Sequence, residues 1–105
     1  MKFGSEENFE IIKKYHLTPS NEENMKVFND VISDTEMICR STYRGTVFEK
    51  DIQDICNSVV CSVIHYFYGQ FETHNDWISP GARNNYLKSM IQKAVYKQYN
   101  FKKKY

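Results

Sequence analysis

Cys61 and His65 are the residues whose types and spacing come closest to a chemical site. They are four positions apart in a stretch of helical periodicity, so their side chains share one helical face. Such a pair could ligate a metal ion or form an activated thiolate. A zinc site needs two further ligands, however, and Cys56 points about 140° away from Cys61 on the same helix. We therefore predict no metal, no cofactor and no catalytic residue, and we expect the pair to be half-buried by a neighbouring helix or a second subunit.

The charged residues are divided along the chain. Residues 1–76 contain seven Lys/Arg and all thirteen Asp/Glu, a net charge of −6, whereas residues 77–105 contain seven Lys/Arg and no acid, a net charge of +7. Such a division affects association, because electric fields steer partners while burial builds the fold. No glycine-rich phosphate loop, zinc-protease pair or nucleophile elbow accompanies the carboxylates. The sequence therefore predicts that the protein is not an enzyme.

Lysine and tyrosine are interleaved on the outward arc of the last predicted helix. At about 100° per residue, this arc holds Lys88, Gln92, Lys93, Tyr96 and Tyr99. Lysine offers charge to phosphate and tyrosine offers a ring for stacking, which suits nucleic acid. A protein partner is equally suited, because tyrosine gives contact area at low entropic cost. Two structural explanations also stay open: the lysines only solvate the helix, or they answer the acidic helices beside it.

Binding of nucleic acid or a nucleotide is the alternative hypothesis. An isoelectric point of about 7.7 is below the basic values typical of such domains. The segment also has a single arginine, which limits the direct recognition of bases. The candidate residues are Arg83, Lys88, Lys93, Lys97, Lys102, Lys103 and Lys104.

The connection Gly69–Ser79 carries Trp77 in an otherwise largely polar stretch. We expect this connection to fold back on the core, because an exposed Trp77-Ile78 pair would favour aggregation. The alternative is that Trp77 anchors a partner, since tryptophan dominates interface hot spots.

Four helices are predicted to position these residues. Ser5 caps a short first helix that ends near His16, and a Ser20–Glu23 capping box begins the second, which ends at Arg44-Gly45. Thr46 caps the third helix, which ends near Tyr68, and Ser79-Pro80 begins the fourth. The third has the broadest apolar arc and is expected to be central. The predicted buried faces are Phe9, Ile12 and His16; Phe28, Val31, Ile32, Thr35, Cys39 and Tyr43; Phe48, Ile52, Ile55, Cys56, Val59, Val63 and Phe67; and Arg83, Leu87, Met90, Ile91, Ala94 and Gln98.

These elements predict an all-α fold, a small antiparallel helical bundle of three long helices plus one short N-terminal helix. At 105 residues with 41% hydrophobic residues, the chain is one domain, 1–105, with 102–105 a frayed basic tail. No apolar run approaches the roughly 18 residues of a membrane span. The N-terminus lacks a signal-type stretch and the three cysteines are odd in number, so we expect a cytoplasmic protein without membrane association.

The sequence thus predicts a small non-enzymatic protein that acts by protein–protein binding, with another protein or with itself as a homo-oligomer. The bias toward Lys, Asn, Tyr, Ile and Phe suits an A+T-rich genome. We therefore expect a viral or phage accessory protein that inhibits or modulates a host factor in the host cytoplasm. The candidate partner-binding residues are Tyr66, Tyr68, Trp77, Lys88, Lys93, Tyr96 and Tyr99.

Overall fold

The computed structural model describes residues 1–14, 22–67 and 79–104, and its description excludes the side chains at 14, 23, 66, 67 and 101–104. These ranges form four helices and no strand: α1 (Glu6–Lys14), α2 (Glu22–Thr42), α3 (Glu49–Phe67) and α4 (Pro80–Lys104). The predicted all-α class is confirmed, with one short helix of 9 residues and three long ones of 21, 19 and 25. No helix in these ranges has the length and apolar character that crossing a bilayer requires.

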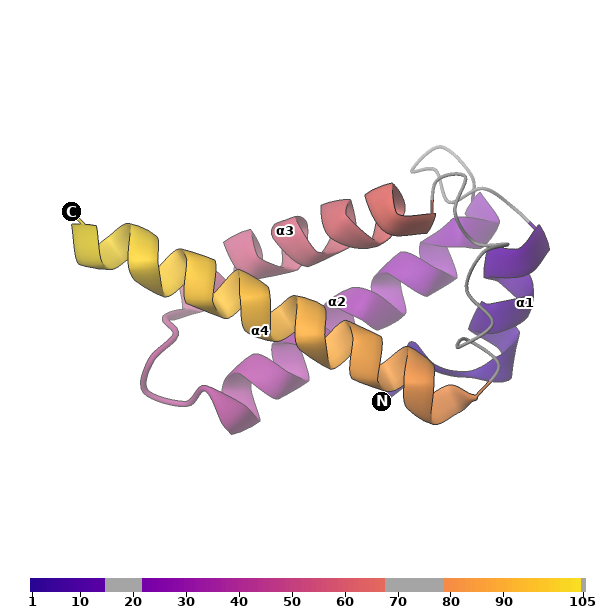
Figure 1. The fold of residues 1–105 in the computed structure, drawn as a ribbon, viewed down its shortest axis with the longest axis horizontal. Coiled ribbons are helices and arrows are strands. Elements are labelled where there is room, and N and C mark those ends of the chain that lie inside the picture. The colour runs from indigo at the N-terminus through magenta and orange to yellow at the C-terminus, as the bar shows by residue number, and fades with distance from the viewer. Residues whose placement is uncertain (15–21, 68–78, 105) are drawn as a thin grey trace.

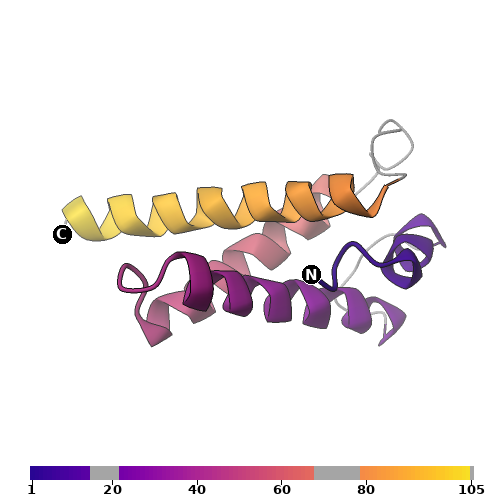
Figure 2. The ribbon, with the colours of Figure 1, turned by 90° about the horizontal axis from the view of Figure 1, so that it is seen from below.

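The three long helices run in alternating directions, as Figure 1 shows. Helix α1 lies across the end of the bundle at which α2 and α4 begin, and the residues before α1 pass between α2 and α4 (Figures 1 and 2). In both views the last turns of α4 project beyond the connection between α2 and α3. The end of α4 therefore has less of the bundle beside it than the beginning does.

Serine caps begin two of the helices, as predicted. The Ser5 hydroxyl accepts the N–H of Asn8 at 3.2 Å, and the Ser79 hydroxyl accepts the N–H of Ala82 at 3.2 Å. In each case a donor of the first helical turn, which has no partner within the helix, is satisfied by the cap. The predicted Ser20–Glu23 capping box lies outside the described residues.

The prediction that Thr46 caps α3 is wrong. The Thr46 hydroxyl donates to the carbonyl oxygen of Tyr43 at 2.7 Å, which closes the turn after α2. The cap of α3 is Phe48, whose N–H donates to the Asp51 carboxylate at 3.3 Å. The predicted burial of Phe48 is wrong for the same reason. Phe48 precedes the first helical residue, so the helical register of Ile52 does not extend to it, and it is 63% exposed.

The helix ends show two further comparisons with the sequence. Helix α2 ends at Thr42, before the predicted Arg44-Gly45. Gly45 has the predicted left-handed conformation, with φ of +85°, but it lies in the turn that the N–H of Thr46 closes by donating to the carbonyl oxygen of Tyr43 at 3.1 Å. Helix α4 continues to Lys104, so the backbone of 102–104 is helical where a frayed tail was expected, and the fraying itself stays a prediction. The predicted end of the third helix beyond Phe67 lies outside the described residues.

The core contains residues from the predicted faces of all four helices, together with Val27 and Val95, which those faces did not include. The buried hydrophobic side chains belong to one cluster: Phe3, Ile12, Val27, Phe28, Val31, Cys39, Ile52, Ile55, Cys56, Val59, Val63, Leu87, Ile91, Ala94 and Val95. Helix α3 contributes five of these residues and packs against both α2 and α4, whereas α2 packs against all three other helices, so α3 shares the central place with α2. Phe3 is the core residue that helical periodicity could not indicate, because it precedes the first helix.

Candidate functional site

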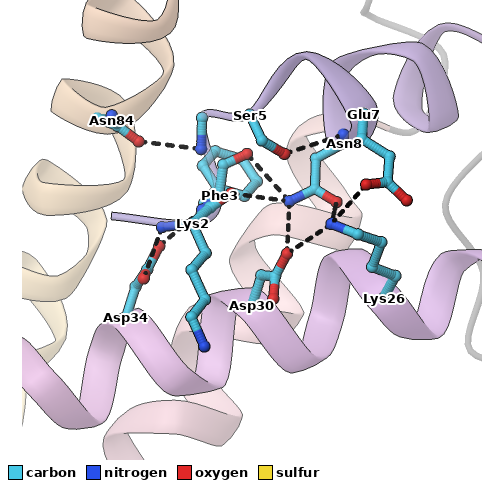
Figure 3. Close-up of polar contacts among 10 residues, drawn as sticks. Lys2, Phe3, Ser5, Glu7, Asn8, Lys26, Asp30, Asp34 and Asn84 are labelled. Atoms are coloured by element: carbon cyan, nitrogen blue, oxygen red, sulfur yellow. Dashed lines mark hydrogen bonds and ion pairs between the residues drawn. The ribbon is translucent and has the colours of Figure 1, made fainter.

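The N-terminal segment is held between α2 and α4 by side chains of both helices (Figure 3). The Asp34 carboxylate, 2% exposed, accepts the N–H of Lys2 at 2.9 Å and the N–H of Phe3 at 2.8 Å. The N–H of Gly4 donates to Asn84 Oδ1 at 2.9 Å. Burial of a carboxylate is costly unless it is hydrogen-bonded, so these contacts explain how Asp34 is tolerated in the interior.

A second group of polar residues joins α1 to α2 (Figure 3). Asn8 is fully buried, and its side-chain amide donates to the carbonyl oxygens of Lys2 and Phe3 and to Asp30 Oδ2. Lys26 Nζ donates to Asn8 Oδ1 at 3.1 Å and to Asp30 Oδ2 at 2.9 Å. Burial acts to raise the pKa of Asp30, but the hydrogen bonds from Asn8 and Lys26 and the charge of Lys26 outweigh it, so this pKa is lowered.

The lowered pKa of Asp30 predicts an acid-sensitive contribution to stability. A carboxyl group whose pKa is lower in the folded state stabilises the fold above its unfolded pKa of about 3.9, and this contribution is lost as the pH falls through the folded pKa. We expect Asp30→Asn to lower the free energy of unfolding at pH 7. In acid, the free energies of unfolding of the variant and of the wild type should approach each other. Denaturant unfolding of both proteins from about pH 7 to pH 2 measures this. A difference that does not change with pH would contradict the role of the charge.

Arg83 of α4 completes the set of contacts that hold the N-terminal segment, which we call the N-terminal anchor. Its side chain is fully buried, and Nε and Nη2 donate to the carbonyl oxygen of Gly4 at 3.0 and 2.9 Å. Nη2 also pairs with Glu6 at 2.7 Å, and the guanidinium lies 4.4 Å from the centre of the Phe9 ring. The predicted inner position of Arg83 is confirmed, but the structure does not bring it to the surface with the lysines. Its place in the alternative nucleic-acid site therefore does not fit this arrangement.

The outward arc predicted for α4 is exposed, and we call its residues the α4 face: Lys88, Gln92, Lys93, Tyr96 and Tyr99. Tyr96 is 58% exposed and Tyr99 is 53% exposed. Burial chiefly, and then the nearby Tyr96 phenol, raises the pKa of Tyr43, the residue that follows α2. The structure thus places two exposed tyrosines near the end of α4 that projects from the bundle.

The lysines of α4 are not neutralised within the described part of the chain. Lys88, Lys93 and Lys97 are all exposed, and none of them forms an ion pair with an acidic side chain described by the structure. The ion pair from α4 to an acidic side chain in these ranges is that of Arg83 with Glu6. The explanation in which the basic helix answers the acidic helices beside it therefore does not apply to these three lysines.

Cys61 and His65 line a groove between α3 and α4. The groove has a volume of about 500 Å³, with Ser58, Cys61, Ser62 and His65 on one side and Tyr86, Met90 and Lys97 on the other. A second hollow of about 330 Å³ continues it toward the end of α4, lined by Asp54, Ile55, Ser58, Ala94, Lys97 and Gln98. Most of the α3 side chains here are small, which is why the space between the two helices is not filled.

The expectation that a neighbouring helix half-buries Cys61 and His65 is wrong, because both are exposed. Cover by a second subunit stays a prediction. No group of three or more potential metal ligands occurs among the described residues. The geometry therefore brings the pair together on one rim of a groove without further ligands from the described chain.

The other sequence-predicted site residues lie outside the description. This applies to Tyr68 and Trp77 and to the side chains of Tyr66 and Lys102–Lys104. The residues of the N-terminal anchor that sequence reasoning missed are Phe3, Asn8, Asp34 and Asn84. Only Phe3 has a pattern in the sequence that could have indicated its burial, because it is an aromatic residue two positions before the Ser5 cap. No family model matches the chain, and no curated protein or solved structure matches it either.

Proposed function

We propose that this chain is a non-enzymatic interaction protein that binds another protein through the α4 face. The observation that carries the proposal is the combination of exposed tyrosines and unneutralised lysines on one side of α4. Composition alone supports the narrower proposal of a viral or phage accessory protein that modulates a host factor.

The α4 face has the chemistry of a recognition surface. Tyrosine contributes a large, rigid contact area with a polar end, and it is enriched at interfaces for this reason. Lysines without an acidic partner keep their full charge available to a partner, which increases the rate of association.

Replacing both tyrosines tests this proposal. We expect Tyr96→Ala with Tyr99→Ala to abolish or strongly weaken partner binding or self-association, because the aromatic anchors carry a disproportionate share of binding energy. Pull-down from the native host and light-scattering mass at several protein concentrations measure the two effects. A matched control is Met25→Ala with Met37→Ala, which removes exposed apolar side chains from α2. If oligomeric state and all captured partners are unchanged in the tyrosine variant, the α4 face is not the binding surface.

Nucleic-acid binding remains the second candidate, because the same lysines are unneutralised and interleaved with tyrosines. Contacts to duplex phosphates predict a log-linear loss of affinity with salt, with a slope of about −0.9 per contact. A protein interface carried by aromatic side chains predicts little response to salt. Absence of binding to a fluorescent oligonucleotide at low salt would remove this candidate.

A further inference from the structure

Two evenly spaced lines of side chains border the groove between α3 and α4. On α3 the line is Asp54, Ser58, Cys61 and His65, and on α4 the lining residues are Tyr86, Met90 and Lys97. Lys93 is exposed and does not line the hollow itself, but it lies on the same helical face as these three residues, four positions before Lys97. With Lys93 included, both lines have the spacing i, i+4, i+7, i+11, which covers about 16 Å, or three turns. Because α3 and α4 run in opposite directions, His65 lies at the Tyr86 end and Asp54 at the Lys97 end (Figure 1).

This groove matches the dimensions of a short helical or extended segment. Helix-in-groove recognition uses apolar anchors at i, i+3 or i+4 and i+7, a spacing that repeats over the same length. Met90 and the small side chains of Ser58 and Cys61 leave room for such anchors in the middle of the groove. The two lines therefore define a place for one amphipathic segment of about three turns.

The charge of the α4 border selects an acidic occupant. Lys93 and Lys97 are four residues apart, so both can reach one segment seated in the groove. Neither is paired with an acidic side chain in the described ranges, and the α3 border offers Asp54 as its one carboxylate. Carboxylates on the side of the segment that faces α4 would complement this border.

A second copy of the chain is a poorer occupant. A symmetric dimer whose two-fold axis runs across the groove would bring the two lysine-bearing borders together, and like charges oppose this contact. If the axis runs along the groove, α4 of each copy faces α3 of the other, and that border offers a single carboxylate, Asp54, to the lysines. Contact between α4 of one copy and the acidic α2 of the next is not self-complementary and would continue into filaments unless its rotation closed a ring.

Nucleic acid is also a poorer occupant of the groove. Arg83, the one arginine of α4, is buried in the anchor, and Asp54 lies beside Lys97 in the continuation of the groove. Duplex nucleic acid carries phosphates along both strands, so some of them would face Asp54, whereas an amphipathic peptide can place its carboxylates only on the side that faces α4.

We infer that the partner of this protein presents an acidic amphipathic segment, which binds in the groove between α3 and α4 with its carboxylates against Lys93 and Lys97. The inference rests on the proposed function, recognition of another protein by α4, and adds the partner's chemistry and the place where it binds. It requires that the binding determinants include the groove as well as the tyrosines.

Selection from a random display library of peptides of about 12 residues, enough for three helical turns, tests the inference without knowledge of the partner. We expect the enriched peptides to be acidic, with apolar residues at helical spacing. Lys93→Glu with Lys97→Glu should weaken their binding about tenfold or more, measured by fluorescence anisotropy, because it replaces attraction by repulsion. Lys13→Glu is the matched control: it is an exposed lysine of α1 that belongs neither to the groove nor to the α4 face, and its substitution should leave affinity within about twofold.

Cys61 reports directly on occupancy of the groove. Cys39 and Cys56 are buried, and burial raises the pKa of both thiols. The pKa of Cys56 is raised to about 11, because the nearby Glu36 and Cys39 add to the effect of burial. Alkylation of the native protein by a maleimide therefore occurs at Cys61, the exposed cysteine. We expect the selected peptides to slow this reaction in proportion to their occupancy, and circular dichroism checks that each variant is folded.

Several results would overturn the inference. These are enrichment of peptides without acidic character, equal binding by the Lys93/Lys97 double variant, and unprotected Cys61 at saturating peptide. Oligonucleotide binding that the same double variant abolishes would favour nucleic acid instead, and a mass that grows with concentration only in the wild type would favour a second copy. Failure of these tests with retained dependence on Tyr96 and Tyr99 would leave the proposed function standing and place the partner outside the groove.

Discussion

Arg83→Ala is expected to lower the free energy of unfolding by about 2–4 kcal/mol, because it leaves a buried carbonyl oxygen without its donors, which costs about 1–3 kcal/mol, and truncates a fully buried side chain. The fully buried guanidinium donates to the Gly4 carbonyl oxygen and pairs with Glu6, so the substitution leaves the carbonyl without these donors and a cavity against Phe9. Since a domain of this size has a total stability of about 5–15 kcal/mol, the loss would be a large part of it. Denaturant unfolding at neutral pH measures the change.

Arg40→Ala provides the matched control for this prediction. Arg40 pairs with Glu49 at 2.7 Å, the same distance as in the Arg83–Glu6 pair. Both Arg40 and Glu49 are exposed, whereas Arg83 is fully buried. A surface ion pair of this kind contributes about 0–1 kcal/mol. Arg83→Lys is also informative, because an ammonium group lacks the planar fork that reaches Gly4 and Glu6 together. Equal losses for Arg83→Ala and Arg40→Ala would show that burial does not set the energy of the anchor.

Phe3→Ala is expected to cost about 3–5 kcal/mol, the usual range for truncating a fully buried phenylalanine. Phe3 has no exposed surface and lies in the core cluster, although it belongs to no helix. The loss is limited by the energy with which the N-terminal segment docks, because the three long helices can remain packed when this segment leaves. Hydrogen exchange distinguishes release of the N-terminal segment from unfolding of the whole domain. If the segment is released first, the amide of Phe3, which donates to Asp34, should lose protection before the amides of α3 do.

Phe48→Ala controls for the chemistry of the substitution. Phe48 is 63% exposed at the cap of α3, so its truncation should change stability by about 1 kcal/mol or less. A cost for Phe3→Ala no larger than that for Phe48→Ala would mean that the N-terminal segment does not contribute to the core.

Helix positions were largely predictable because they depend on local patterns. The stripe of α3 from Ile52 to Val63 follows the period of the helix, and all of its predicted residues with described side chains are buried except Phe48. The serine caps at Ser5 and Ser79 act on donors only three residues away. The cap of the third helix was predicted at Thr46, two residues before its actual position at Phe48. Phe48 was therefore counted within the helix and wrongly predicted to be buried.

The candidate site was predictable on its outer side only. Helical arithmetic correctly placed Lys88, Lys93, Tyr96 and Tyr99 on the exposed face of α4, and the structure adds Lys97 to the exposed lysines. It could not show that α3 would leave a groove at Cys61 and His65, because the depth of a groove depends on how far apart two helices pack. The pairing of Arg83 was also beyond it, since Gly4 lies 79 residues away in the chain.

The sequence by itself determined the all-α class, most of the buried faces and the division of charge, because each follows from residue type and spacing along one element. Only the tertiary structure decided how that charge is used. It directs the single arginine of α4 into a buried anchor with Gly4 and Glu6, and it leaves Lys88, Lys93 and Lys97 exposed without an acidic partner in the described ranges. The physical reason is that ion pairing and burial depend on which distant segments meet, and helical periodicity carries no information about that.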